Sequence, residues 1–115
     1  MKAAFVIFDR MTALDFIGVY DPVTRLKSMR FLHDLTWDIC GISGRVTDDR
    51  GLVFTPTKTG GALNGYDLAI VPGGFGTRTL RDDRVFIDWL RTAADCRLKA
   101  SVCTGALLLG AAGLL

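Results

Sequence analysis

The sequence is poor in the residues that build metal sites and disulfide frameworks. It contains one histidine, His33, and three cysteines, Cys40, Cys96 and Cys103, in 115 residues. No two cysteines form a CxxC motif, and none is spaced with the histidine as zinc ligands are. An odd number of cysteines also argues against a set of paired disulfides. We therefore expect free thiols in a reducing cytoplasm, and no bound metal.

An excess of one charge and long apolar runs are also missing. The formal net charge is +2 and no cluster of lysine and arginine stands out, which argues against nucleic acid and membrane as partners. The apolar run from Met1 to Phe8 is too short for a signal peptide or a membrane span. The last fifteen residues are nearly all small or apolar but are interrupted by Gly105, Gly110 and Gly113, which favours a buried helix.

What the sequence does contain is a regular alternation of strand and helix patterns. Half of the residues are hydrophobic, enough for the core of one domain over residues 1–115. Strands are predicted at residues 2–8, 35–43, 67–71 and 97–102, of which the first and third are near-continuous apolar runs. A polar-tipped ribbon is expected at 44–57, with a turn near Asp49 to Gly51, at an edge or as an arm.

Helical patterns lie between these strands. Asp21 followed by Pro22 predicts a helix that starts there and runs to about Phe31, so that residues 12–20 form the preceding turn. Asp82 or Asp83 is expected to cap the next helix. Its apolar stripe is predicted to comprise Val85, Phe86, Trp89, Leu90 and Ala93. A last helix follows Cys103-Thr104-Gly105 directly. This order predicts an α/β fold with a doubly wound parallel sheet, a flavodoxin-like three-layer sandwich.

The predicted topology gathers a few polar residues at one edge of the sheet. In an open parallel sheet, ligands bind where the strands end at their carboxyl side. The residues expected in such turns are Asp15, Gly73, Gly74, Cys103 and Thr104. Cys40 lies inside a strand, while Cys96 and His33 precede strands and belong to the opposite edge. Of the three cysteines, only Cys103 is placed for chemistry.

Cys103 has two interpretations. A free cysteine is often a small hydrophobic residue packed beneath a helix. On a sharp strand-to-helix turn, however, the thiol is held above the sheet at a helix N-terminus, which lowers its pKa and favours the nucleophilic thiolate. Gly105 favours the second interpretation, because a sharp elbow requires small residues just after the nucleophile.

The other residues at this edge also have two interpretations. Gly73 and Gly74 either present backbone N–H groups to charge that develops on a substrate, or form a plain turn after Pro72. Asp15 is either a turn residue or the acid/base partner of Cys103. A carboxyl group enclosed beside a thiolate has a raised pKa, so it stays protonated and can donate a proton.

Three stretches together carry a family resemblance: SVCTGALLLGAAGLL, AIVPGG and TALDFIG. They resemble the ThiJ/PfpI (class I glutamine amidotransferase-like) family, most closely its isonitrile hydratase branch, over essentially the whole chain. The resemblance implies that Cys103 is the nucleophile, Asp15 the acid, and Thr104 the residue beside the nucleophile, with Gly73 and Gly74 as the glycine pair. It also implies a small-molecule substrate, a homodimer, and no metal or organic cofactor.

The sequence departs from the family pattern in two places. Val19 stands where a proline commonly follows the LDxxG motif. The chain also stops at GLL, where family members continue into further strands and helices, so it resembles only the N-terminal part of the family domain. We therefore expect a truncated sheet with an apolar face and a strand edge left uncovered.

The resemblance implies hydration of an isonitrile to an N-substituted formamide. One alternative is another ThiJ/PfpI cysteine hydrolase or carbonyl-adduct enzyme, although acyl transfer normally uses a histidine that this edge of the sheet lacks. A second alternative is a non-catalytic ligand-sensing domain of a transcription regulator, although no helix-turn-helix segment is present. A third is a partial chain that folds poorly and has no activity.

Overall fold

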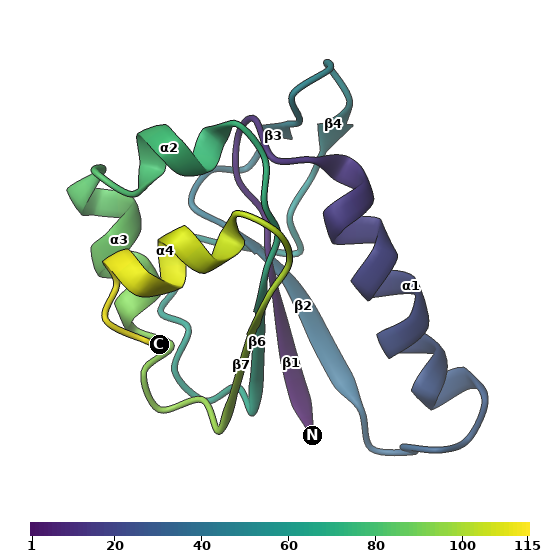
Figure 1. Ribbon diagram of the computed structural model, residues 1–115. Helices are drawn as coiled ribbons and strands as arrows, with labels where there is room; N and C mark the ends of the chain where they lie inside the picture. The colour runs from purple at the N-terminus through teal and green to yellow at the C-terminus, as the bar shows by residue number, and fades with distance from the viewer.

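Five parallel strands form the central sheet of the computed structural model, which describes all 115 residues (Figure 1). In spatial order they are β5 (Lys58–Thr59), β2 (Thr36–Gly41), β1 (Lys2–Val6), β6 (Leu68–Val71) and β7 (Leu98–Ser101). The sequence predicts four of them. The fifth, β5, has only two residues and leaves no apolar pattern. The central strand β1 is buried from Ala3 to Val6, as expected for a strand covered on both faces.

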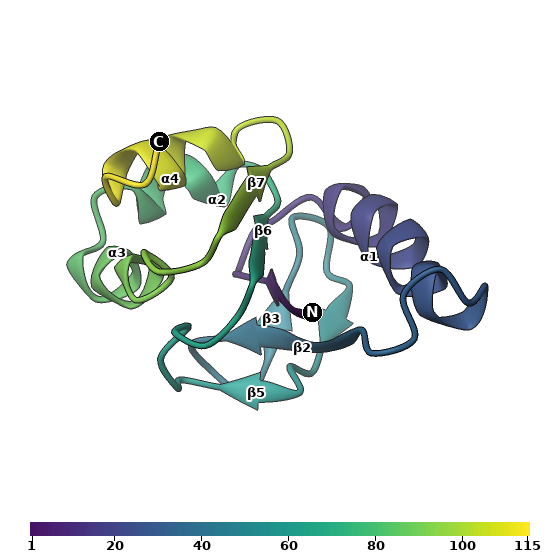
Figure 2. The same cartoon turned by 90° about the horizontal axis from the view of Figure 1, so that it is seen from below.

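Helices cover both faces of the sheet. The helix α1 (Ala13–Ser28) packs on one face, and α2 (Gly76–Leu80), α3 (Arg84–Arg91) and α4 (Gly105–Ala111) lie on the other (Figures 1 and 2). This arrangement confirms the predicted doubly wound, three-layer α/β architecture. No helix combines the length and the apolar character that crossing a bilayer requires.

The first helix begins nine residues before the predicted start. It opens at Ala13 after Thr12, so Pro22 lies inside the helix rather than at its first position, and Asp15 lies in its first turn. The prediction gave too much weight to the Asp-Pro pair. The missed signal is an apolar stripe at helical spacing, Phe16, Val19, Tyr20 and Val23, which packs against the core. Packing of this stripe outweighs the cost of a proline within a helix.

The third helix begins as predicted, at Asp83. The Asp83 carboxylate accepts a hydrogen bond from the Phe86 backbone N–H at 3.1 Å, which is a standard N-cap interaction. One member of the predicted stripe is wrong: Val85 is 70% exposed, and Ile87 is buried in its place. The five-residue helix α2 was not predicted, because its sequence, GTRTL, contains one large apolar residue and no periodic stripe.

The predicted ribbon is present as the antiparallel pair β3 (Val46–Thr47) and β4 (Val53–Phe54). Hydrogen bonds join this pair of strands to the turn between β1 and α1. The Arg10 N–H donates to the Thr47 carbonyl at 2.8 Å, and the Thr47 N–H donates to the Asp9 carboxylate at 2.9 Å. These bonds fix the turn at residues 9–12, which forms one wall of the candidate site.

Candidate active site

The junction between β7 and α4 is a strained elbow at Cys103. The backbone of this residue has φ = +51°, in the left-handed region that residues other than glycine rarely adopt. Gly105 makes the turn possible, because a Cβ atom there would lie 2.7 Å from the Pro72 carbonyl oxygen and would overlap that of Val71. The helix α4 starts at this glycine. The predicted sharp turn from strand to helix is therefore present in the backbone.

Three turns at the carboxyl end of the sheet meet around this elbow, those that follow β1, β6 and β7 (Figure 1). The Thr12 N–H donates to the Gly73 carbonyl at 2.8 Å, and the Gly74 N–H donates to Thr104 Oγ1 at 3.1 Å. A Cβ atom on Gly73 would lie 2.8 Å from the Thr104 nitrogen. Gly74 has φ = +134°, which favours glycine. The two glycines thus let the three turns approach one another.

The three cysteines differ in burial as expected from their places in the sheet. Cys103 is exposed, whereas Cys40 and Cys96 are buried. Burial raises the pKa of the Cys40 thiol and of the Cys96 thiol, since a thiolate loses its hydration there. The interpretation of Cys103 as a small hydrophobic residue packed beneath a helix is therefore excluded.

Cys103 opens into a shallow pocket of about 170 Å³. The other residues that line it are Thr12, Gly74, Phe75, Arg78 and Thr104. Two of the predicted site residues, Gly74 and Thr104, thus share the pocket with the thiol. Thr12, Phe75 and Arg78 were not predicted. Thr12 lies at the end of the β1–α1 turn, and the other two belong to the start of α2, which has no signal in the sequence.

Asp15 reaches the same junction from the first turn of α1. One of its carboxylate oxygens, Oδ2, accepts a hydrogen bond from the Gly73 N–H at 3.2 Å. Asp15 is not among the residues that line the pocket, and no hydrogen bond joins its carboxyl group to Cys103 Sγ. The structure therefore links Asp15 to the Cys103 turn through the glycine pair, and not by the direct contact that an acid/base pair suggests.

The backbone N–H groups of the glycine pair are both engaged within the protein, Gly73 with Asp15 and Gly74 with Thr104. In contrast, the N–H groups of Cys103 and Thr104 have no hydrogen-bond acceptor in the protein. An N–H group directly after a nucleophile is a common donor to developing negative charge. The free donors at this junction thus lie on the elbow itself.

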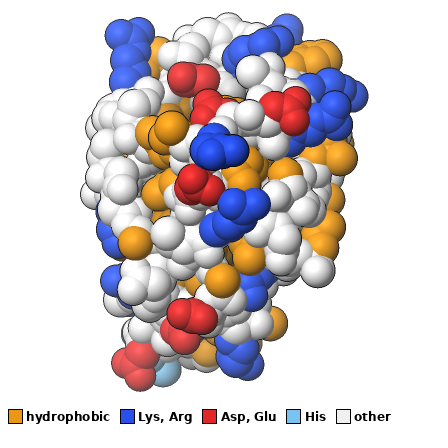
Figure 3. All heavy atoms as spheres, turned by 90° about the vertical axis from the view of Figure 1, so that its left-hand side faces the viewer, with side chains coloured by type: hydrophobic (Ala, Val, Ile, Leu, Met, Phe, Trp, Pro, Cys, Tyr) orange, Lys and Arg blue, Asp and Glu red, His pale blue; other side chains and the backbone are white.

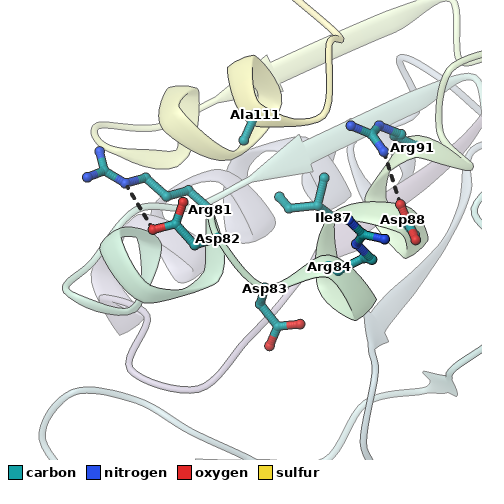
Figure 4. Close-up of a pocket in the computed structure, with 8 residues that line it drawn as sticks. All are labelled: Arg81, Asp82, Asp83, Arg84, Ile87, Asp88, Arg91 and Ala111. Atoms are coloured by element: carbon teal, nitrogen blue, oxygen red, sulfur yellow. Dashed lines mark hydrogen bonds and ion pairs between the residues drawn. The ribbon is translucent and has the colours of Figure 1, made fainter.

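A larger open pocket of about 440 Å³ lies between α2, α3 and α4, on the face drawn in Figure 3. Figure 4 shows that arginine and aspartate side chains line it. Two ion pairs form there, between Arg81 and Asp82 at 4.0 Å and between Arg91 and Asp88 at 3.0 Å. None of the predicted site residues lines this pocket. Its three arginines and three aspartates balance in charge, and such exposed pairs contribute little to stability.

Comparison with known proteins identifies the family of this chain. The family model described as "DJ-1/PfpI family" matches residues 1–115. The chain belongs to the DJ-1/PfpI family. This confirms the resemblance drawn from the three sequence stretches.

The chain is similar to one protein in sequence and to two solved structures in fold. It is 37% identical over 116 residues to an isonitrile hydratase from Pseudomonas putida, an alignment that covers all of this chain and 49% of the relative. The solved structure of oxidised DJ-1 from Toxoplasma gondii superposes with a TM-score of 0.78 at 20% identity, over 99% of this chain and 62% of the other. An AraC family transcriptional regulator from Pseudomonas putida superposes with a TM-score of 0.71 at 24% identity, over 99% of this chain and 62% of the other.

The two solved structures show a shared fold and nothing finer. The chain spans about half the length of the isonitrile hydratase and about 60% of each of these two structures. The chain contains both the elbow and the turns that surround it.

Proposed function

We propose that this chain carries the nucleophile of an isonitrile hydratase, which adds water to R–N≡C and yields the formamide R–NH–CHO. The observation that carries the proposal is the 37% identity to an isonitrile hydratase over the whole of this chain. The exposed Cys103 on its strained elbow supports it, since a nucleophile must be reachable. The reaction needs a soft nucleophile, a proton donor and a placed water.

In the first step, the Cys103 thiolate attacks the terminal carbon of the isonitrile. A bond forms between Sγ and this carbon, and the carbon receives a proton from the carboxyl group of Asp15. The product is a thioimidate, R–N=CH–S–Cys103, beside an ionised Asp15. The unpartnered N–H groups of Cys103 and Thr104 lie next to the bond that forms. They are the groups in this chain suited to stabilise charge at the reacting centre.

In the second step, water adds to the thioimidate carbon. Asp15 accepts one proton from the water and regains its starting form. The remaining hydroxyl proton passes to the nitrogen, the C–S bond breaks, and the Cys103 thiolate leaves. Thr104 is proposed to orient the water, because its hydroxyl group lies in the pocket beside the thiol and contacts the backbone of Gly74.

In this scheme Asp15 acts from a position next to Gly73 rather than from direct contact with Cys103. Its Oδ2 atom is held by the Gly73 N–H, which fixes the carboxyl group at the junction. Catalytic hydrogen bonds are often long in unliganded enzymes and tighten when substrate binds. The proton transfer is therefore assigned to the substrate complex. An isonitrile has no leaving group, so the reaction needs no histidine to protonate a leaving group.

The test is formamide production from a simple alkyl isonitrile, followed by mass spectrometry. Cys103→Ala is expected to abolish the reaction, and Asp15→Asn to slow it by about 10²-fold or more, the usual effect of removing a general acid. Cys40→Ala, at a buried thiol away from the pocket, is the matched control and is expected to retain the rate. Equal rates for the wild type and Cys103→Ala would overturn the proposal.

A further inference from the structure

We infer that Arg78 makes this site selective for anionic substrates, namely isonitriles that carry a carboxylate on an apolar body. The inference rests on the proposed function and goes beyond it by naming the substrate class. It is carried by three observations: the place of Arg78 in the pocket of Cys103, its lack of a partner in the protein, and the apolar side chain beside it.

Arg78 and Phe75 form the α2 side of the Cys103 pocket. They are three residues apart at the start of this helix, a spacing that places two side chains on the same face. The elbow with Cys103 and Thr104 forms another part of the lining. A molecule whose reactive carbon contacts Cys103 therefore extends past both Phe75 and Arg78.

Arg78 is the charged side chain among the six that line this pocket. It is exposed and takes part in no ion pair or hydrogen bond through its guanidinium group. The carboxyl group of Asp15, at the same junction, accepts a hydrogen bond from the Gly73 N–H and does not line the pocket. The guanidinium group is thus free to bind an external anion, and its planar fork matches a carboxylate in two parallel hydrogen bonds.

Phe75 determines which chemical group suits the uncharged part of the substrate. Its side chain is 63% exposed and has no role in the core, although it lies in the pocket. A ring or short alkyl body can pack on this face while a carboxylate reaches Arg78.

The test compares two isonitriles of the same shape, 4-isocyanobenzoate and its neutral amide. The readout is the ratio of kcat/KM for the anion to that for the amide. In Arg78→Gln this ratio is expected to fall about five-fold, the effect of one exposed ion pair, and Arg78→Lys is expected to recover part of it. Arg84→Gln removes an exposed arginine outside the pocket and is expected to leave the ratio unchanged.

A second readout does not depend on hydratase activity. Iodoacetate and iodoacetamide alkylate the same thiol, but only the first is an anion. The ratio of their rates at Cys103 is expected to be several-fold lower in Arg78→Gln than in the wild type, and to fall with rising salt in the wild type. A ratio that is the same in both proteins would overturn the inference. A lowered ratio in a protein that hydrates no isonitrile would instead overturn the proposed function and leave the anion selectivity standing.

Discussion

Cys103 differs from the other two cysteines in exposure and in backbone conformation. It has a positive φ at the end of β7 and opens to solvent, whereas Cys40 and Cys96 are buried. Strained backbone at an exposed nucleophilic side chain is typical of functional sites, where the surrounding structure holds the strain. Here the surroundings are the glycines that let three turns pack together.

The buried thiols predict how stability depends on pH. Burial raises the pKa of Cys40 and of Cys96, while in the unfolded chain a thiol ionises near pH 8.5. Above that pH the unfolded state binds fewer protons than the folded state, so the free energy of unfolding falls as pH rises. We expect a loss of about 1 kcal/mol per thiol between roughly pH 7.5 and 9.5.

Urea unfolding across this pH range measures the effect. A Cys40→Ala variant is less stable overall but is expected to show a shallower decline, because one of the two linked protons has been removed. A decline of equal slope in the wild type and the variant would contradict the assignment of this pH dependence to the buried thiols.

For individual residues, the sequence predicts which of them lie at the same edge of the sheet, but not which atoms form hydrogen bonds. Asp15, Gly73, Gly74, Cys103 and Thr104 all lie at the carboxyl edge of the sheet, because their strands are parallel. The bond from the Gly73 N–H to Asp15 depends on the exact approach of two turns, which no spacing in the sequence encodes. Their catalytic roles stay predictions.

The elbow between β7 and α4 depends on close packing at one glycine. Gly105→Ala is expected to lower the free energy of unfolding by about 2 kcal/mol or more, since the added methyl group meets backbone carbonyls that cannot move aside. Gly44→Ala is the matched control, because a Cβ atom there meets nothing within 4 Å. Thermal unfolding of both variants measures the difference. Equal midpoints would contradict this account of the elbow.

Pro22 is an internal weakness of α1. It has no N–H group to donate to the carbonyl four residues earlier, and a proline ring crowds that carbonyl. Pro22→Ala restores the donor, and we expect it to raise the free energy of unfolding by about 1–2 kcal/mol, less than the full helix penalty because proline also restricts the unfolded chain. Urea unfolding tests this. A lower stability in the variant would show that the proline is needed for the helix.

The sequence predicts elements best where a long apolar pattern is present. The strands β1 and β6 follow from such patterns, and the cap at Asp83 follows from local capping chemistry. The start of α1 was missed because a local signal, Asp-Pro, competed with a stripe that depends on tertiary packing. The short α2 and β5 form because their neighbours hold them, and α2 is where Phe75 and Arg78 enter the site.

In the whole molecule, the sheet ends at β7 with an unpaired edge. The strand order places β7 at one end, and its first residue, Leu98, is 45% exposed. The elbow with Cys103 lies directly after this edge strand. The homodimer and the reducing compartment expected from the sequence stay predictions.

Detection of the covalent intermediate tests the central claim most directly. The protein is mixed with an alkyl isonitrile, quenched, digested and analysed by mass spectrometry. We predict that the peptide containing Cys103 gains the full mass of the isonitrile, because the thioimidate forms without loss of a leaving group, while the peptides with Cys40 and Cys96 gain nothing. Formamide release with no adduct at Cys103 at any time point, or an equal adduct on all three cysteines, would contradict the account.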